Sequence, residues 1–145
     1  MTTMTNPASG LSNYKQNYSL TSFVETGSHL GESLKYAKDI GFEKVYGCDI
    51  HGPYVDICKE RVPEATMIHS ESISFLQNLL PTINEKTFFW LDAHFPAYYG
   101  LQENESTKFP LIEECLLIKQ LKQNYENDVI VCDDVRILLP DNNPL

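Results

Sequence analysis

Acidic and hydrogen-bonding side chains follow each of five short apolar runs in the chain. The residues at these positions are Glu25, Asp49, the segment 69–72, Asp92 with His94, and the pair Asp133 and Asp134. Segments with helical spacing separate the runs, so we expect parallel strands whose carboxyl ends meet at one edge of a sheet. In open sheets of this kind, ligands bind outside that edge. These polar residues are therefore the candidates for a ligand site.

The first turn, FVETGSHLGES (residues 23–33), could either cradle a ligand or simply join a strand to a helix. Gly27 and Gly31 would let the backbone approach a ligand closely, and the helix that follows would offer free N–H groups. Glu25 precedes the turn, so a cationic or zwitterionic ligand suits it better than a pyrophosphate does. We expect His29 to form a hydrogen bond beside the ligand. The GxxxG spacing differs from the GxGxxG of dinucleotide-binding folds, which argues against a nicotinamide dehydrogenase.

Asp49 ends the second apolar run and has two interpretations. A carboxylate at this place can accept hydrogen bonds from both hydroxyls of a ribose. Alternatively, it could cap the helix expected after it, which has Pro53 in its first turn. The glycine turn before it favours the ribose interpretation.

Asp92, Asp133 and Asp134 follow the fourth and fifth runs, which would be neighbouring strands in the usual order. Three converging carboxylates repel one another unless a cation lies between them, and such ligands suit Mg²⁺, Ca²⁺ or Mn²⁺. Capping of a following turn by Asp133 or Asp134 is the alternative. His94 could act as a general base or a further metal ligand, or it could be an exposed loop residue.

The elements that must position these residues alternate along the chain. Strands are expected over residues 22–26, 43–50, 65–69, 86–92 and 128–134, and helices over residues 31–42, 53–62, 72–80 and 109–125. This order predicts an α/β fold: a doubly wound, mainly parallel sheet with helices on both faces. Residues 1–20 are expected to be a flexible arm or one short helix, and residues 21–145 a single ligand-binding domain.

The composition limits the classes of partner. The 145 residues have a formal net charge of −9, which argues against nucleic acid or an anionic membrane surface as the main partner. There is no long apolar stretch or signal-peptide pattern, and the four cysteines show no CxxC spacing. We therefore expect a cytoplasmic protein with reduced thiols and a small-molecule substrate.

Taken together, the motifs resemble those of class I S-adenosylmethionine-dependent methyltransferases, most closely the metal-dependent O-methyltransferases of the catechol and caffeoyl-CoA type. FVETGSHLGES is similar to that family's first motif, VYGCDI to its ribose-binding strand, and IHSESISFL to its adenine segment. FFWLDAHF and VIVCDD resemble its two metal-bearing strand ends. The resemblance implies the sheet order 3-2-1-4-5 and a cofactor site formed by Glu25, Gly27, His29, Gly31, Ser33, Asp49, Ile50, Glu71, Ser72 and Asp92. It also implies Asp92, Asp133 and Asp134 as ligands of Mg²⁺.

The implied reaction is methylation of a hydroxyl group on a small molecule with metal assistance, for which His94 is the candidate base. Two features depart from the family. DAHFPAYYG lacks the family's catalytic lysine, and about a dozen residues follow the fifth strand, so the usual last two strands are not expected. We expect another copy of the chain to cover the exposed sheet edge. The alternatives are a non-catalytic S-adenosylmethionine-binding domain and an enzyme that cleaves the cofactor.

Overall fold

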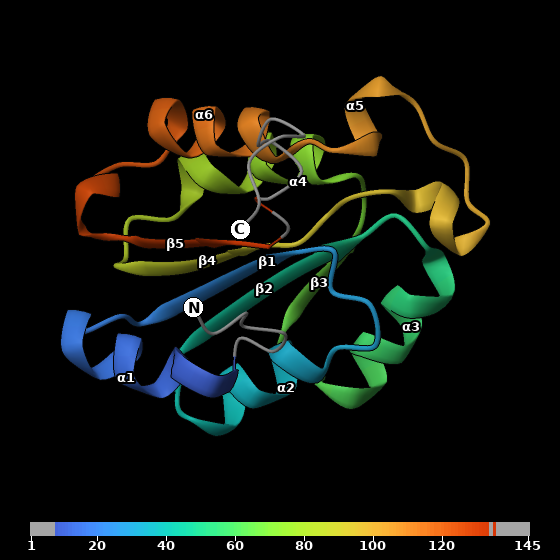
Figure 1. Cartoon of the computed structure of the whole chain (residues 1–145). Coiled ribbons are helices and arrows are strands. Elements are labelled where there is room, and N and C mark those ends of the chain that lie inside the picture. The colour runs from blue at the N-terminus through green and yellow to red at the C-terminus, as the bar shows by residue number, and fades with distance from the viewer. Residues whose placement is uncertain (1–7, 134, 136–145) are drawn as a thin grey trace, which may run out of the picture.

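A parallel sheet forms the centre of the molecule. The computed structural model describes residues 8–133 and residue 135. Its strands are β1 (Ser22–Thr26), β2 (Lys44–Asp49), β3 (Thr66–His69), β4 (Thr87–Leu91) and β5 (Val129–Cys132). They lie in the order β3-β2-β1-β4-β5, and every neighbouring pair is parallel (Figure 1). The predicted fold class and strand order are confirmed, and the described residues contain no further strand.

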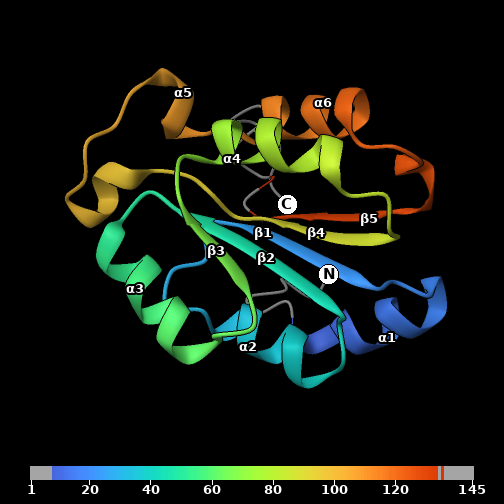
Figure 2. The same cartoon turned by 180° about the vertical axis from the view of Figure 1, so that it is seen from behind.

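Helices cover both faces of the sheet (Figures 1 and 2). One face carries α1 (Ala8–Tyr18), α2 (Glu32–Asp39) and α3 (Gly52–Arg61). The other carries α4 (Ser72–Leu79) and α6 (Leu111–Leu121), with the single-turn helix α5 (Glu105–Lys108) beyond the sheet edge. Short 3₁₀ turns lie at Leu80–Thr82, Pro96–Tyr99 and Tyr125–Asn127. This arrangement is the doubly wound form that alternating strands and helices predict.

Each face of the sheet has its own apolar core. On the α1–α3 face, Phe23 of β1 stacks on Phe88 of β4 with ring centroids 5.8 Å apart. On the opposite face, Phe89 and Leu91 pack with Leu76 of α4 and other residues of α4 and α6. All residues of β1 and β4 are buried, as expected for the central strands of a parallel sheet.

The N-terminal segment adopts the helical alternative of the two that the sequence left open. Residues 8–18 form α1, so this part of the predicted flexible arm is an ordered helix. Leu11 is fully buried in the core of the α1–α3 face, and the Tyr14 ring lies 5.8 Å from that of Phe88. Apolar contact with the sheet explains the order, because a short helix has little stability of its own in water.

Helix α6 ends at Leu121, four residues earlier than the sequence pattern predicts. The next residue, Lys122, leaves the helical conformation and its side chain is completely buried. Its ammonium group lies 3.1 Å from Asp128 Oδ2 and donates hydrogen bonds to the backbone carbonyls of Glu85 and Gln123. A buried lysine needs such partners, and these contacts require the chain to turn here.

The chain changes direction across the sheet between β1 and β4. Strands β2 and β3 extend from one side of β1, whereas β4 and β5 extend from the other. Ligands of doubly wound folds bind in the crevice that this reversal creates at the carboxyl ends of the strands. The site is therefore expected where Glu25, Asp49 and Asp92 are placed.

Candidate functional site

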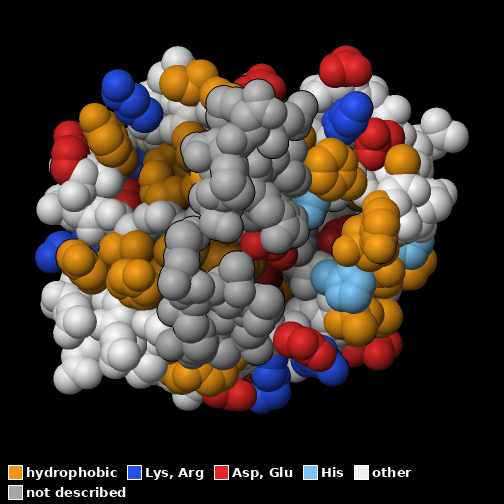
Figure 3. Space-filling view, viewed as in Figure 1, with side chains coloured by type: hydrophobic (Ala, Val, Ile, Leu, Met, Phe, Trp, Pro, Cys, Tyr) orange, Lys and Arg blue, Asp and Glu red, His pale blue; other side chains and the backbone are white. Residues whose placement is uncertain are grey.

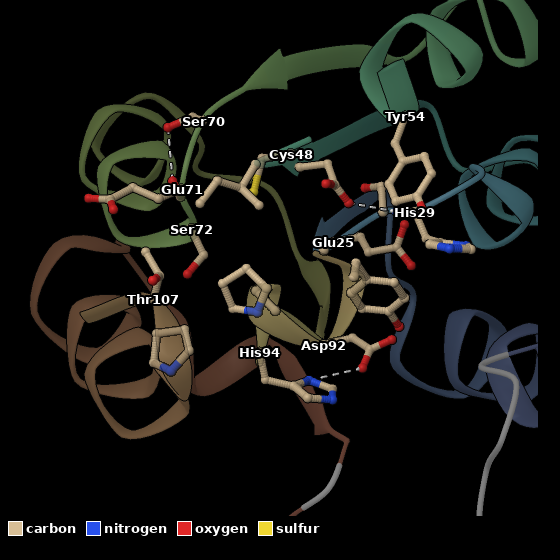
Figure 4. Close-up of a pocket in the computed structure, with 18 of the residues that line it drawn as sticks. Glu25, His29, Cys48, Tyr54, Ser70, Glu71, Ser72, Asp92, His94 and Thr107 are labelled. Atoms are coloured by element: carbon tan, nitrogen blue, oxygen red, sulfur yellow. Dashed lines mark hydrogen bonds and ion pairs between the residues drawn. The ribbon is translucent and has the colours of Figure 1, made fainter. Parts of the chain in front are cut away.

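A cavity of about 310 Å³ lies at this crevice. Its walls come from the turn after β1, the ends of β2 and β3, and the loop that leads from β4 to α6. Figure 4 shows the side chains of Glu25, Asp92 and His94 around one side of it and those of Ser70, Glu71 and Ser72 around another. In Figure 3, acidic and histidine side chains gather on the right of the face shown. Four of the five strand ends singled out from the sequence thus contribute to one cavity.

Gly27 is required by the close packing of the turn against β4. Its φ angle is +74°, and a Cβ atom there would lie 2.7 Å from the backbone oxygen of Asp92. The carbonyl of Cys48 accepts hydrogen bonds from the N–H groups of both Gly27 and Ser28. Gly31 has a φ angle of +78° and immediately precedes α2, but it does not line the cavity. Gly27 therefore forms part of the wall, whereas Gly31 only shapes the turn.

Glu25 is a buried acid at the end of β1. Its side chain lines the cavity, only 2% of the residue is exposed, and Oε2 has no hydrogen-bond partner. Burial raises the pKa of Glu25 from 4.5 to about 8; Ser33 and Ser28 oppose this rise and the charge of Asp49 adds to it. An unpartnered buried polar atom in a native protein needs an explanation, and Glu25 lines the cavity in which a ligand would lie.

Asp49 joins two turns instead of capping a helix. Its Oδ2 accepts a hydrogen bond of 2.9 Å from the His29 N–H, and its Oδ1 accepts one of 2.8 Å from the His51 N–H. The residue preceding α3 is His51, which forms no side-chain cap. Each carboxylate oxygen can accept more than one hydrogen bond, so Asp49 can still receive hydroxyl donors from the cavity that it lines.

His29 is fixed in an unusual backbone conformation. Its φ angle is +50°, a region that residues other than glycine rarely adopt. Three contacts hold it there: its N–H donates to Asp49, its carbonyl accepts from the Cys58 thiol, and its ring lies against Tyr54 with centroids 4.5 Å apart. The Tyr99 ring is also near, at 5.7 Å. These contacts place His29 on the wall of the cavity, and its hydrogen bond beside a ligand stays a prediction.

The remaining predicted cofactor residues lie on the same walls. Ser33 is in the first turn of α2, Ile50 follows β2, Glu71 immediately precedes α4, and Ser72 begins it. Glu71 accepts a hydrogen bond of 3.2 Å from the Ser74 hydroxyl, which fixes one of its oxygens. The structure therefore brings every predicted cofactor residue except Gly31 to one cavity.

The three predicted metal ligands are not assembled by the residues that the structure describes. Asp92 lines the cavity, and its Oδ1 lies 3.6 Å from His94 Nδ1. Asp133 does not line the cavity; its N–H donates to the carbonyl of Leu91. Asp134 lies outside the described residues. Within the described part of the chain, no three His, Cys, Asp or Glu side chains are grouped as a metal site would require.

Solved structures share this architecture at low sequence identity. A Podospora anserina methyltransferase with bound S-adenosylhomocysteine superposes with a TM-score of 0.60 at 14% identity, over 87% of this chain and 51% of that one. A Bacillus cereus O-methyltransferase in complex with the same compound gives 0.55 at 17% identity, over 81% and 53%. A ribosomal protein L11 methylase of Lactobacillus delbrueckii gives 0.58 at 10% identity, over 86% and 56%.

The chain has the fold of class I methyltransferases. It spans about half the length of the structures that it matches. No protein-family model matches the sequence, and the search of curated proteins finds no match.

In the described residues, no helix is long and apolar enough to cross a membrane. All four cysteines are free thiols.

Sequence reasoning missed several residues of the site. Ser28 and Tyr54 line the cavity, and so do Thr107 and Pro110 from the segment between β4 and α6. The only signal for Thr107 and Pro110 was their position, because the loop from β4 to α6 must pass over the same sheet edge. The burial of Glu114 in α6 was missed too; this residue does not line the cavity, it is fully buried, and both of its carboxylate oxygens lack hydrogen-bond partners.

Proposed function

We propose that the chain is an S-adenosylmethionine-dependent methyltransferase domain that acts on a small molecule. The observation that carries the proposal is the pair Glu25 and Asp49, two carboxylates on the wall of one cavity in a class I methyltransferase fold. S-adenosylmethionine supplies a methyl group that its sulfonium centre has already activated. The cavity residues then need only to bind the cofactor, align the acceptor and remove a proton.

The donor set fits this cofactor. Asp49 retains acceptor capacity toward ribose hydroxyls while two backbone N–H groups hold its orientation. Glu25 offers a buried, unpartnered oxygen to the ammonium group of the amino-acid portion. Glu71 immediately precedes α4 and Ser72 begins it; both lie on another wall and are proposed to lie beside the adenine.

The loop after β4 is proposed to form the acceptor side. His94 would take the proton of an acceptor hydroxyl, and Asp92, 3.6 Å away, would orient and stabilise the imidazolium that results. Tyr99 and Thr107 line the same side of the cavity. No Lys or Arg among the described residues lines it, so a neutral or cationic acceptor suits the cavity better than an anionic one.

Metal assistance is a separate part of the proposal. It rests on the sequence pattern of Asp92, Asp133 and Asp134 after two strands that are neighbours in the sheet. Calorimetric titration with Mg²⁺, Ca²⁺ and Mn²⁺, repeated on Asp133→Asn, tests it directly. Saturable binding that the substitution abolishes would support a metal site, and its absence would leave a metal-free transferase.

The main test is calorimetric binding of S-adenosylhomocysteine to the wild-type chain, followed by a screen of hydroxylated acceptors for methyl transfer. Stoichiometric binding and transfer would support the proposal. Binding without transfer to any acceptor would support the alternative of a binding domain, and release of methylthioadenosine would support cofactor cleavage. Failure to bind the nucleoside would refute all three.

We also propose that a second copy of the chain covers the edge of the sheet. Ile130 of the edge strand β5 is 38% exposed, and Ile112 and Leu116 of α6 are 59% and 50% exposed. Exposed apolar side chains on an edge strand and on a helix favour association with another protein surface. Sedimentation velocity should show a dimer that Leu116→Glu dissociates, and a monomer at all concentrations would refute this part.

A further inference from the structure

Glu25 is a buried acid with one oxygen that has no hydrogen-bond partner, and it lines a cavity whose described walls carry no Lys or Arg side chain. Its Oε2 has no hydrogen-bond partner, although the nearby hydroxyls of Ser33 and Ser28 favour the ionised form of the acid. No Lys or Arg of the described chain lines the cavity. A carboxylate in such surroundings is costly to ionise, because burial removes its hydration and no Lys or Arg of the described residues lines the cavity to compensate.

The groups around Glu25 do not offer such a charge. Asp49 adds a like charge, and the nearby thiols are neutral at physiological pH because their pKa values are raised. Titratable residues of neighbouring segments surround Glu25. They are His29 in the turn after β1 and Glu32 in α2; Cys48 and Asp49 in β2; Tyr54 and Cys58 in α3; and Asp92, His94 and Tyr99 after β4.

We propose that Glu25 is protonated in the ligand-free protein and that the ammonium group of an S-adenosylmethionine-type ligand displaces this proton. The inference rests on the proposed function, since it assumes a nucleoside ligand that bears an amino-acid group. The proton leaves a Glu25 oxygen and passes to the buffer, while the ligand keeps its own ammonium protons. Ligand binding and proton release are then one coupled equilibrium.

The coupling has a defined size. With the pKa of the free Glu25 carboxyl at about 8, ligand binding at pH 7 should release about 0.9 proton if Glu25 is fully ionised in the complex. Affinity should rise about tenfold per pH unit between pH 6 and 7.5 and level off above pH 8. The sign follows from mass action, because raising the pH removes the competing proton.

Titration calorimetry in buffers of different ionisation enthalpy measures the proton number directly. The ligands are S-adenosylhomocysteine, which has the ammonium group, and 5′-methylthioadenosine, which shares the nucleoside and lacks the amino acid. The variant is Glu25→Gln, whose folding is checked by circular dichroism. We expect wild type to release about 0.9 proton more than Glu25→Gln with the first ligand and no excess with the second. Proton exchange at any other group that occurs in both proteins cancels in this difference.

Two results would overturn the inference alone. These are equal proton release by wild type and Glu25→Gln, and equal release with the two ligands in wild type. If neither ligand binds, the proposed function fails and this inference fails with it. If Glu25→Gln does not fold, Ser33→Ala replaces it: removing a hydroxyl that favours the ionised acid should extend the affinity slope to higher pH. An unchanged slope in that variant would also overturn the inference.

Discussion

Substituting Glu114 by Gln should make the protein less sensitive to alkaline pH. Glu114 is fully buried on α6, and burial raises the pKa of its carboxyl from 4.5 to about 7, although Ser72 and Thr26 oppose the rise. Between these two values the folded state binds more protons than the unfolded state, so the free energy of unfolding falls as the pH rises. At about 1.4 kcal/mol per pKa unit, the loss is about 3 kcal/mol over the whole range, of which roughly 2 to 3 kcal/mol falls between pH 5 and pH 8.

Urea denaturation at pH 5 and pH 8 measures this effect. Wild type should lose this amount of stability relative to Glu114→Gln as the pH rises, because the amide does not ionise. Glu25 has a pKa shift of the same sign, but it is present in both proteins and cancels in the difference. Glu113→Gln, an exposed neighbour on the same helix, is the matched control and should follow wild type. Parallel pH profiles of wild type and Glu114→Gln would refute the assignment of a buried, neutral carboxyl at this position.

Three further substitutions test the turn, the ribose position and the opposite end of the sheet. Gly27→Ala should abolish S-adenosylhomocysteine binding, because it combines left-handed strain of about 1–2 kcal/mol with a backbone collision. Gly41→Ala, at a φ angle of +99° with only an ordinary contact of 3.9 Å to the Lys15 side chain, should show the strain alone in urea melts. Asp49→Asn should weaken calorimetric binding of the same ligand roughly 10- to 150-fold, the equivalent of about 1.5–3 kcal/mol for bonds to a charged acceptor. Lys122→Met leaves Asp128 buried without its cation and should lower the free energy of unfolding by about 3–5 kcal/mol. Unchanged denaturation midpoints in that variant would contradict the buried ion pair.

The sequence predicted the sheet and most of the cavity because both depend on simple patterns. Apolar runs that alternate with helical segments specify a parallel sheet, and its carboxyl edge then brings Glu25, Asp49 and Asp92 together. The order of the strands came from the resemblance to methyltransferases, since alternation alone allows several orders.

The burial of two ionisable residues, Glu114 in α6 and Lys122 directly after it, was not predictable in the same way. Glu114 and Lys122 lie three and eleven residues after Leu111, on the face that also buries Ile118. Periodicity therefore places them toward the core, whereas their chemical type assigns them to the surface. The structure resolves the conflict differently at each position: Lys122 has an ion pair, and Glu114 has a raised pKa.

Burial of acids at the ligand-binding edge gives folding and ligand binding opposite dependences on pH. Glu25 and Glu114 both have raised pKa values, so the ligand-free protein loses stability as the pH rises toward 8. A cationic ligand reverses this penalty at Glu25, because it supplies the charge that the cavity lacks. The stabilisation that such a ligand gives should therefore grow over the same pH range in which the ligand-free fold weakens. The ionised Glu25 carboxylate has no opposite charge beside it in the described part of the chain, so its ionisation lowers the free energy of unfolding of the ligand-free protein. The same missing charge gives the site affinity for a cationic ligand.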